Sequence, residues 1–107
     1  MTDKLWKSIE RKVAAFIGGE RVPVSGRQRG FSPDVRHPLF SIEVKHKQEL
    51  PAWLFDALEQ AEQSKTGEQI PLVILHEKGQ SIPDCLCVLR LSDILVLAKF
   101  AEKDGEI

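Results

Sequence analysis

Within the segment from Leu39 to His46, apolar and polar side chains alternate from Phe40 to Lys45, and this alternation restricts the possible folds more than any other feature of the chain. A strand has a side-chain period of two, so successive residues face opposite sides of a sheet. One side of the predicted strand is apolar and would pack on a core. The other side carries Glu43 and Lys45. The pattern therefore predicts a half-buried strand with a carboxylate and an ammonium group on its open face.

The remaining residues divide into helices and strands joined by short links. In chain order we expect a helix over 4–17, strands over 20–24, 32–36 and 39–46, a helix from Pro51 that stops by Gly67, strands over 70–76 and 85–91, and a helix that Ser92 caps. Residues 70–76 are almost all apolar, which predicts a strand buried on both faces. The order α-β-β-β-α-β-β-α predicts an α/β fold with a central mixed β-sheet flanked by helices. A chain of 107 residues fits one domain, residues 1–107.

The first predicted helix has an apolar face with a carboxylate at its edge. On a wheel of about 100° per residue, the apolar side chains fill one arc about 120° wide. Glu10 lies at the edge of this arc, near Ile17. Its carboxylate could turn inward to a site or outward to water. Gly18 and Gly19 then end the helix, because glycine accepts the left-handed backbone of a helix C-cap.

The net charge of −1 conceals two halves of opposite sign. Residues 1–47 hold ten Lys or Arg against five Asp or Glu, a net of +5, and residues 48–107 hold five against eleven, a net of −6. A basic half of this kind could face a polyanion. The alternative is two solvated faces of opposite charge.

Two further features concern the compartment. No apolar run approaches the roughly 18 residues of a membrane span, and the amphipathic N-terminal segment lacks the apolar centre of a signal peptide. We therefore expect a cytoplasmic protein. Cys85 and Cys87 form a C-x-C pair that we expect to be two reduced core cysteines, since no second pair exists to complete a zinc site.

Asp34, Glu43 and Lys45 form the most informative polar constellation. Asp34 would end one strand, and the short link through His37-Pro38 could bring it back beside Glu43. Two carboxylates and an ammonium group would then meet, which is costly unless a divalent cation binds the carboxylates. The arrangement suggests Mg²⁺-dependent phosphodiester chemistry. The structural alternative is a surface salt bridge between Lys45 and one carboxylate.

A polar loop, residues 25–30, precedes this constellation. Its glycines would let backbone N–H groups approach a phosphate, and Arg27 and Arg29 would supply positive charge. Ser25 could orient the phosphate or could simply serve the turn. The other candidate phosphate contacts are Arg21, Arg36 and Lys47.

Four pieces of sequence occur in an order that resembles the PD-(D/E)xK nuclease superfamily. They are Glu10 in the first helix, the segment Arg21-Val22-Pro23-Val24-Ser25-Gly26, the pair Pro33-Asp34, and Glu43-Val44-Lys45. Within the superfamily the chain is most similar to the archaeal-type Holliday junction resolvases, including their phage-borne relatives. The resemblance runs from Trp6 to about Leu91 and is specific over residues 9–47. It implies a restriction-endonuclease-like core.

The resemblance also implies the roles of the metal-binding residues. Asp34 and Glu43 would bind Mg²⁺, or Mn²⁺ as a substitute, with the Val44 carbonyl as a third ligand. Glu10 would complete the shell around the ion or hold a water molecule there. Lys45 would position the attacking water or stabilise the developing charge. Ser25 would lie near the scissile strand as a further catalytic residue.

The implied activity is that of a metal-dependent, structure-selective DNA endonuclease. The first hypothesis is a Holliday junction resolvase that makes paired symmetric incisions in branched DNA as a homodimer, since a two-fold dimer matches a two-fold junction. The alternatives are another nuclease of the superfamily (nicking, flap or restriction-like) and a non-catalytic DNA-binding protein of the same fold. A phage-borne enzyme of this kind would act in the host cytoplasm.

Overall fold

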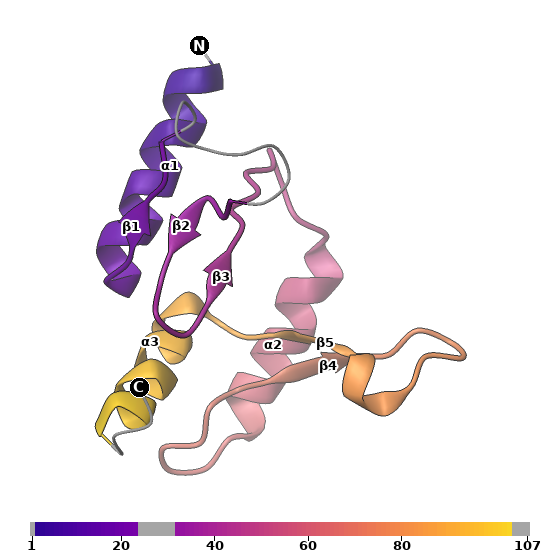
Figure 1. The fold of residues 1–107 in the computed structure, drawn as a ribbon. Helices are drawn as coiled ribbons and strands as arrows, with labels where there is room; N and C mark the ends of the chain where they lie inside the picture. The colour runs from indigo at the N-terminus through magenta and orange to yellow at the C-terminus, as the bar shows by residue number, and fades with distance from the viewer. Residues whose placement is uncertain (1, 24–31, 104–107) are drawn as a thin grey trace. The chain divides into compact units, whose positions relative to one another are not determined.

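A computed structural model describes residues 2–23 and 32–103 of the chain (Figure 1). Its elements, in order, are α1 (Thr2–Ile17), β1 (Glu20–Arg21), β2 (Val35–Arg36), β3 (Ser41–Ile42), α2 (Ala52–Ser64), β4 (Val73–Leu75), the 3₁₀ turn η2 (Ile82–Asp84), β5 (Leu86–Val88) and α3 (Leu91–Lys103). The described residues therefore form a mixed α/β fold. Apart from the 3₁₀ turn, the order of helices and strands is the one that the sequence predicts.

The strands are shorter than the sequence predicts, and they pair in two small sheets. β1, β2 and β3 form an antiparallel sheet in that order, and β4 pairs with β5 in a second antiparallel sheet. The chain also divides into two compact units, one formed by residues 1–48 and 98–107 and the other by residues 49–97. Each sheet belongs to one unit. A single mixed sheet is not among the pairings of the described residues, so it stays a prediction.

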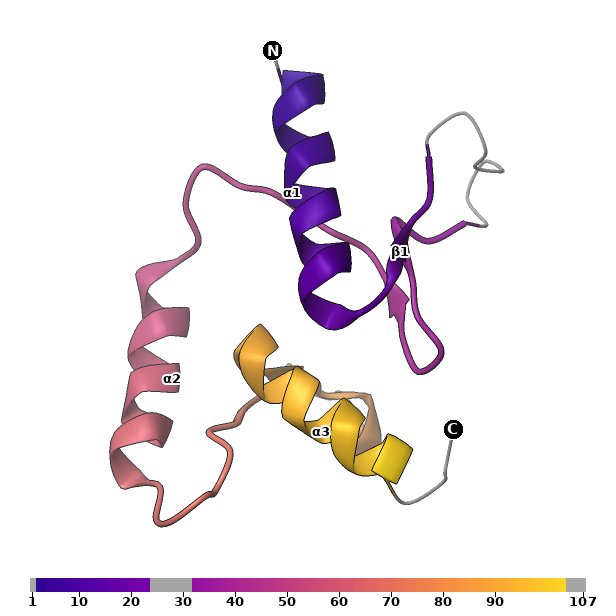
Figure 2. The ribbon, with the colours of Figure 1, turned by 90° about the vertical axis from the view of Figure 1, so that its left-hand side faces the viewer.

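In the first unit, α1 lies along β1 and β2, and Figure 2 shows β1 running back beside the helix. The buried stripe of α1 is made by Glu10, Ala14 and Ile17, which are spaced four and three residues apart. Leu5 and Phe16, which the sequence pattern assigns to the apolar arc, are each 46% exposed. Of the two alternatives that the sequence leaves open for Glu10, the structure has the inward one, and its carboxylate lies in the middle of the buried stripe.

Two glycines end α1 for two different physical reasons. Gly18 has a φ of 74°, a left-handed backbone that L-residues avoid. The N–H group of Gly19 then donates to the Ala14 carbonyl at 2.9 Å, which closes the helix as a Schellman motif does. A Cβ atom on Gly19 would lie 2.6 Å from the Arg36 carbonyl oxygen, so only glycine allows β1 to approach β2 this closely.

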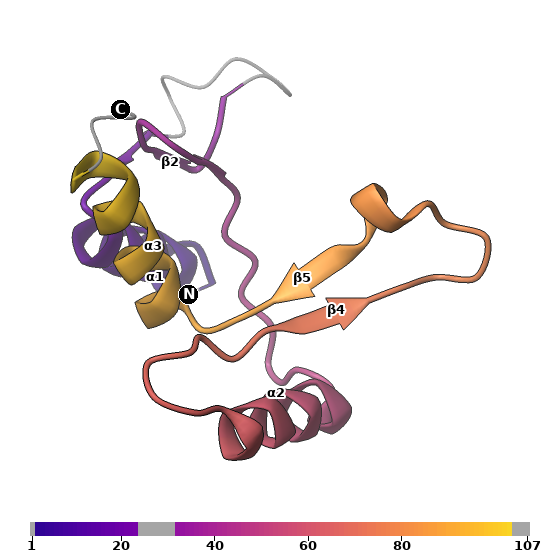
Figure 3. The ribbon, with the colours of Figure 1, turned by 90° about the horizontal axis from the view of Figure 1, so that it is seen from below.

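In the second unit, α2 contacts β4 and covers one side of the β4–β5 pair (Figure 3). Leu58 of α2 is buried. By contrast, Leu72, which precedes β4, is 47% exposed, and Ile74 on β4 is 54% exposed. The prediction that residues 70–76 are buried on both faces is therefore wrong for the described chain. The reason is that β4 pairs with one strand, β5, and is covered by one helix within its unit.

An ion pair joins the end of α2 to the residue that follows β5 by two positions. Arg90 Nε donates to Glu62 Oε2 at 2.7 Å, and both side chains remain partly exposed. This hydrogen bond lowers the pKa of Glu62 from its ordinary value of 4.5 and raises the pKa of Arg90, and the charge attraction between the two groups acts in the same direction. The pair therefore links α2 to the segment after β5 on the solvent side.

Two further predictions concern the cysteines and membrane-spanning segments. Cys85 and Cys87 are free, and Cys87 is exposed, so its predicted place in the core is wrong. No helix in the described ranges has the length and apolar character that a bilayer crossing requires.

Candidate functional site

The antiparallel pairing of β2 and β3 brings two acidic residues face to face. Val35 pairs with Ile42, so continuing the register outward by one residue places Asp34 opposite Glu43. The Asp34 N–H group donates to the Ile42 carbonyl at 2.9 Å and lies 3.2 Å from Glu43 Oε2. The pairing therefore continues beyond the strand ends and sets the two acids side by side, although eight residues separate them in the sequence.

Asp34 is held through its backbone on one side and its side chain on the other. Its carbonyl accepts a hydrogen bond from the Val22 N–H group at 3.0 Å, which extends the β1–β2 pairing by one residue. Its carboxylate oxygen Oδ2 accepts a hydrogen bond from the Val44 N–H group at 2.8 Å. Asp34 is only 9% exposed. Its carboxylate is therefore oriented before any ligand binds.

Lys45 lies on the same side of the chain as Glu43. From Ser41 to Lys45 exposed and half-buried residues alternate, with Ile42 and Val44 on the half-buried side, as the sequence pattern predicts. Lys45 is exposed, and it makes no hydrogen bond or ion pair with another residue of the described ranges. The structural alternative of a salt bridge between Lys45 and a carboxylate therefore has no support in the part of the chain that the structure describes.

Glu10 takes part in a different contact, with β1. Arg21 Nε donates to Glu10 Oε1 at 2.9 Å, and the exposed fractions of the two side chains are 17% and 4% respectively. The Arg21 guanidinium carbon lies 5.9 Å from the centre of the Trp6 ring, within the range of a cation–π contact. Arg21 was predicted to contact phosphate, yet its side chain lies mostly inside the protein.

The carboxylate pair determines how well the site suits a metal ion. Within the described residues, no three His, Cys, Asp or Glu side chains are grouped so that they could hold one. Mg²⁺, however, usually binds proteins through one or two carboxylates and takes its other ligands from water and substrate phosphate. Asp34 and Glu43 supply two hard oxygen donors of this kind, so the residues fit Mg²⁺. Glu10 as a third ligand and the Val44 carbonyl stay predictions.

The predicted DNA contacts fall into three groups. Arg36 and Lys47 are exposed, as a phosphate contact requires. Arg21 is paired with Glu10 in the interior. Ser25, Arg27 and Arg29 lie outside the described residues.

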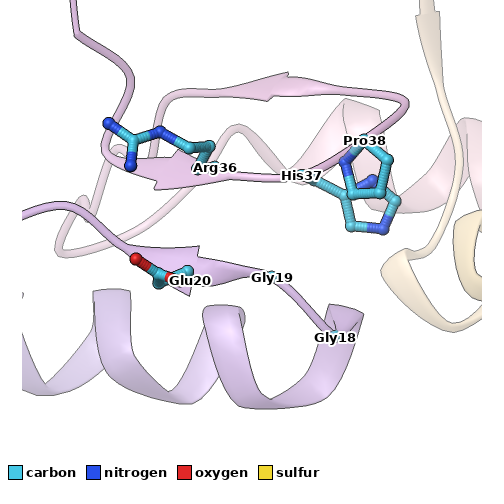
Figure 4. A pocket seen from close by; sticks show the side chains of 6 residues that line it. All are labelled: Gly18, Gly19, Glu20, Arg36, His37 and Pro38. Atoms are coloured by element: carbon cyan, nitrogen blue, oxygen red, sulfur yellow. The ribbon is translucent and has the colours of Figure 1, made fainter.

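The β2–β3 hairpin also has an ordered tip that the sequence reasoning missed. The rings of His37 and Phe40 stack with their centres 5.1 Å apart, and the Leu39 N–H group donates to His37 Nδ1 at 3.0 Å. A hollow of about 460 Å³ lies beside the tip, and its lining is shown in Figure 4: Gly18, Gly19, Glu20, Arg36, His37 and Pro38. Glu20 and Arg36 are cross-strand partners of opposite charge, so the hollow does not favour a ligand of one sign. Two aromatic rings flanking a Pro-Leu pair were the available signal for this tip.

Comparison of the chain with protein-family models, with curated proteins and with solved structures finds no match. The interpretation of the site therefore depends on its own residues: a carboxylate pair with fixed geometry, a lysine beside it, and exposed basic residues on the same unit.

Proposed function

We propose that this chain is a metal-dependent, structure-selective DNA endonuclease of the PD-(D/E)xK type, and that it resolves four-way DNA junctions. The observation that supports this most directly is the position of Asp34 opposite Glu43, with Asp34 N 3.2 Å from Glu43 Oε2. Lys45 follows on the same side and is exposed. The proposal includes the finer fold, a restriction-endonuclease-like core with a central mixed sheet.

Asp34 and Glu43 are the residues that would hold Mg²⁺ or Mn²⁺, together with the Val44 carbonyl and with Glu10 from α1. The bound ion would supply positive charge that makes water a better nucleophile and offsets the charge on the phosphate. Asp34 contributes a carboxylate that the Val44 N–H group already orients at 2.8 Å. Such preorganisation avoids reorientation of the ligand during the reaction.

Lys45 is the group proposed to act on the phosphate or on the attacking water. Because it forms no ion pair within the described ranges, its ammonium group can donate to a substrate oxygen without first breaking an internal contact. A donor placed where charge develops stabilises the transition state more than the ground state. Arg36 and Lys47, both exposed, are proposed to bind neighbouring phosphates.

Resolution of a junction needs two cuts, and we propose that a homodimer provides the two active sites. The second unit exposes large apolar side chains that a second copy could cover. Trp53 and Phe55 on α2 are 56% and 47% exposed, and Leu86 on β5 is 66% exposed. Side chains of this size are costly to leave in water, and aromatic residues are common at the centres of interfaces.

Cleavage of an immobile synthetic four-way junction tests the proposal, with linear duplex, single strand and flap as matched substrates, each in Mg²⁺ and in EDTA. We expect paired symmetric incisions in the junction alone, in Mg²⁺ alone. Equal cutting of duplex or flap would keep the Asp34–Glu43 site but assign another nuclease role. Binding of DNA without cutting of any substrate would favour a non-catalytic protein and contradict the proposal.

A further inference from the structure

Arg21 faces the helix and not the solvent. It pairs with Val35 across β1 and β2, and directly opposed residues in an antiparallel pair point to the same face of the sheet. Val35 is fully buried, and α1 lies along both strands. An arginine on this face is unusual, because a charged side chain is stable there only with a partner.

The partner is Glu10, in the middle of the buried stripe of α1. The Nε–Oε1 distance of 2.9 Å and the 4% exposure of the Glu10 side chain describe a largely desolvated ion pair. Arg21 Nη2 is also buried and finds no hydrogen-bond acceptor in the described part of the chain. A buried pair with an unsatisfied donor is a poor way to gain stability, since apolar side chains of similar volume often serve as well or better.

The same strand connects this pair to the carboxylate site. Val22 follows Arg21, and its N–H group donates to the Asp34 carbonyl at 3.0 Å. The connection therefore runs from Glu10 on α1 through the Arg21 side chain, along one residue of β1, and across a backbone hydrogen bond to Asp34. Arg21 is therefore linked to Glu10 by its side chain and to Asp34 through the backbone of the next residue.

We infer that Arg21 is a positioning residue that acts through Glu10 and fixes it relative to Asp34, and that it does not bind a DNA phosphate. This inference rests on the proposed nuclease function. The guanidinium group suits the role better than an ammonium group, because it donates from Nε while its flat face lies near the Trp6 ring. Lysine could supply the charge but not both contacts.

A double-mutant cycle tests the inference, with single-turnover cleavage of whichever DNA the wild-type protein cuts. The variants are Glu10→Gln, Arg21→Met and the double variant. We expect Arg21→Met to slow cleavage by roughly 10- to 100-fold, the range found when a residue that orients a metal ligand is removed. We expect the double variant to be no slower than the slower single variant, because Arg21 has nothing to position once Glu10 is changed.

The salt dependence of DNA binding without metal gives a second readout, with Arg36→Met as the matched control. Loss of one phosphate contact lowers the slope of log K against log salt by about 0.9 on duplex DNA. We expect this decrease for Arg36→Met and an unchanged slope for Arg21→Met. A decreased slope for Arg21→Met would make Arg21 a phosphate contact and overturn the inference.

Folding is checked by circular dichroism, and Arg21→Lys is the fallback variant, with a cleavage rate expected between wild type and Arg21→Met. Two variants that both unfold would make the pair a stability element and overturn the inference. Losses that multiply in the double variant would overturn it too. A wild-type protein that neither cuts DNA nor binds Mg²⁺ in calorimetry would instead overturn the proposed function, and the inference with it.

Discussion

The amide nitrogen of Asp34, just before β2, lies 3.2 Å from Oε2 of Glu43, just after the antiparallel partner strand β3. Glu43 therefore accepts from the backbone of Asp34, while Asp34 Oδ2 accepts from the backbone N–H group of Val44 at 2.8 Å, so each carboxylate is held by a backbone donor on the opposing segment. Glu43 is the exposed member of the pair, and Asp34 is the buried one.

Asp34→Asn tests the metal assignment without removing the local hydrogen bond. The asparagine side-chain oxygen can still accept from the Val44 N–H group, which now donates at 2.8 Å to Asp34 Oδ2. We expect an unchanged fold and a loss of cleavage of at least about a hundredfold, because a neutral amide binds Mg²⁺ weakly. Cleavage rate, Mg²⁺ calorimetry and circular dichroism check this. An Asp34→Asn protein with full activity would remove the basis of the metal assignment.

Lys45→Ala separates chemistry from metal binding. Lys45 has no ion pair within the described ranges, so its loss leaves no internal partner unsatisfied. We expect unchanged thermal stability, unchanged Mg²⁺ affinity and a cleavage rate lower by about 100- to 1,000-fold, as for removal of one transition-state donor. Lys78→Ala, a lysine in the turn after β4, is the control. Equal rates for the two variants would contradict the catalytic role of Lys45.

Gly18→Ala and Gly19→Ala should both destabilise the protein, by different mechanisms. At Gly18 the space is open, but the φ of 74° disfavours alanine by about 1 kcal/mol. At Gly19 a Cβ atom would meet the Arg36 carbonyl oxygen at 2.6 Å, so backbone must move at a cost of about 2 kcal/mol or more. Urea denaturation of both variants measures which of them loses more free energy of unfolding. A smaller loss at Gly19 than at Gly18 would disagree with the close strand approach.

The Glu62–Arg90 ion pair predicts a small, pH-dependent stabilisation. The pKa of Glu62 is lowered below 4.5 by the hydrogen bond from Arg90, so the contribution is fully present above pH 4.5 and is lost as the pH falls through the lowered value. Arg90→Met should lower the melting temperature slightly at pH 7 and not at a pH well below 4.5, because exposed pairs contribute little. Lys78→Met serves as the reference. A difference between the variants that persists in acid would assign the effect to packing.

Local signals predicted the three helices, although Ser92, the predicted cap of the last helix, lies inside α3 (Leu91–Lys103). The periodic apolar residues and the Gly18-Gly19 pair predict a first helix over 4–17, and α1 spans Thr2–Ile17. These signals act within a few residues, so the sequence contains them in full. The short link between Asp34 and Glu43 is local in the same sense, and the hairpin follows from it.

Non-local packing could not be read from the chain in the same way. An apolar run such as residues 70–76 shows which side chains could be buried. It does not show which other elements will pack against them, and Ile74 remains 54% exposed. Glu10 illustrates the converse. The hydropathy of the helix places it at an edge, whereas its burial depends on Arg21, eleven residues later on β1. The available signal was its spacing from Ala14 and Ile17, which share the buried stripe.

The three hydrogen-bonding groups of Asp34 have a consequence for its replacement. Its backbone N–H and carbonyl groups make the hydrogen bonds to the two neighbouring strand segments, which any residue except proline could make. Its side chain also accepts a hydrogen bond from the Val44 N–H group. A screen for soluble protein should therefore tolerate asparagine at this position and few other residues. A screen for DNA cleavage should reject asparagine as well. At position 34, asparagine would thus be enriched among variants selected for soluble protein and depleted among variants selected for cleavage. Sequencing the two selected sets of variants would show this difference directly.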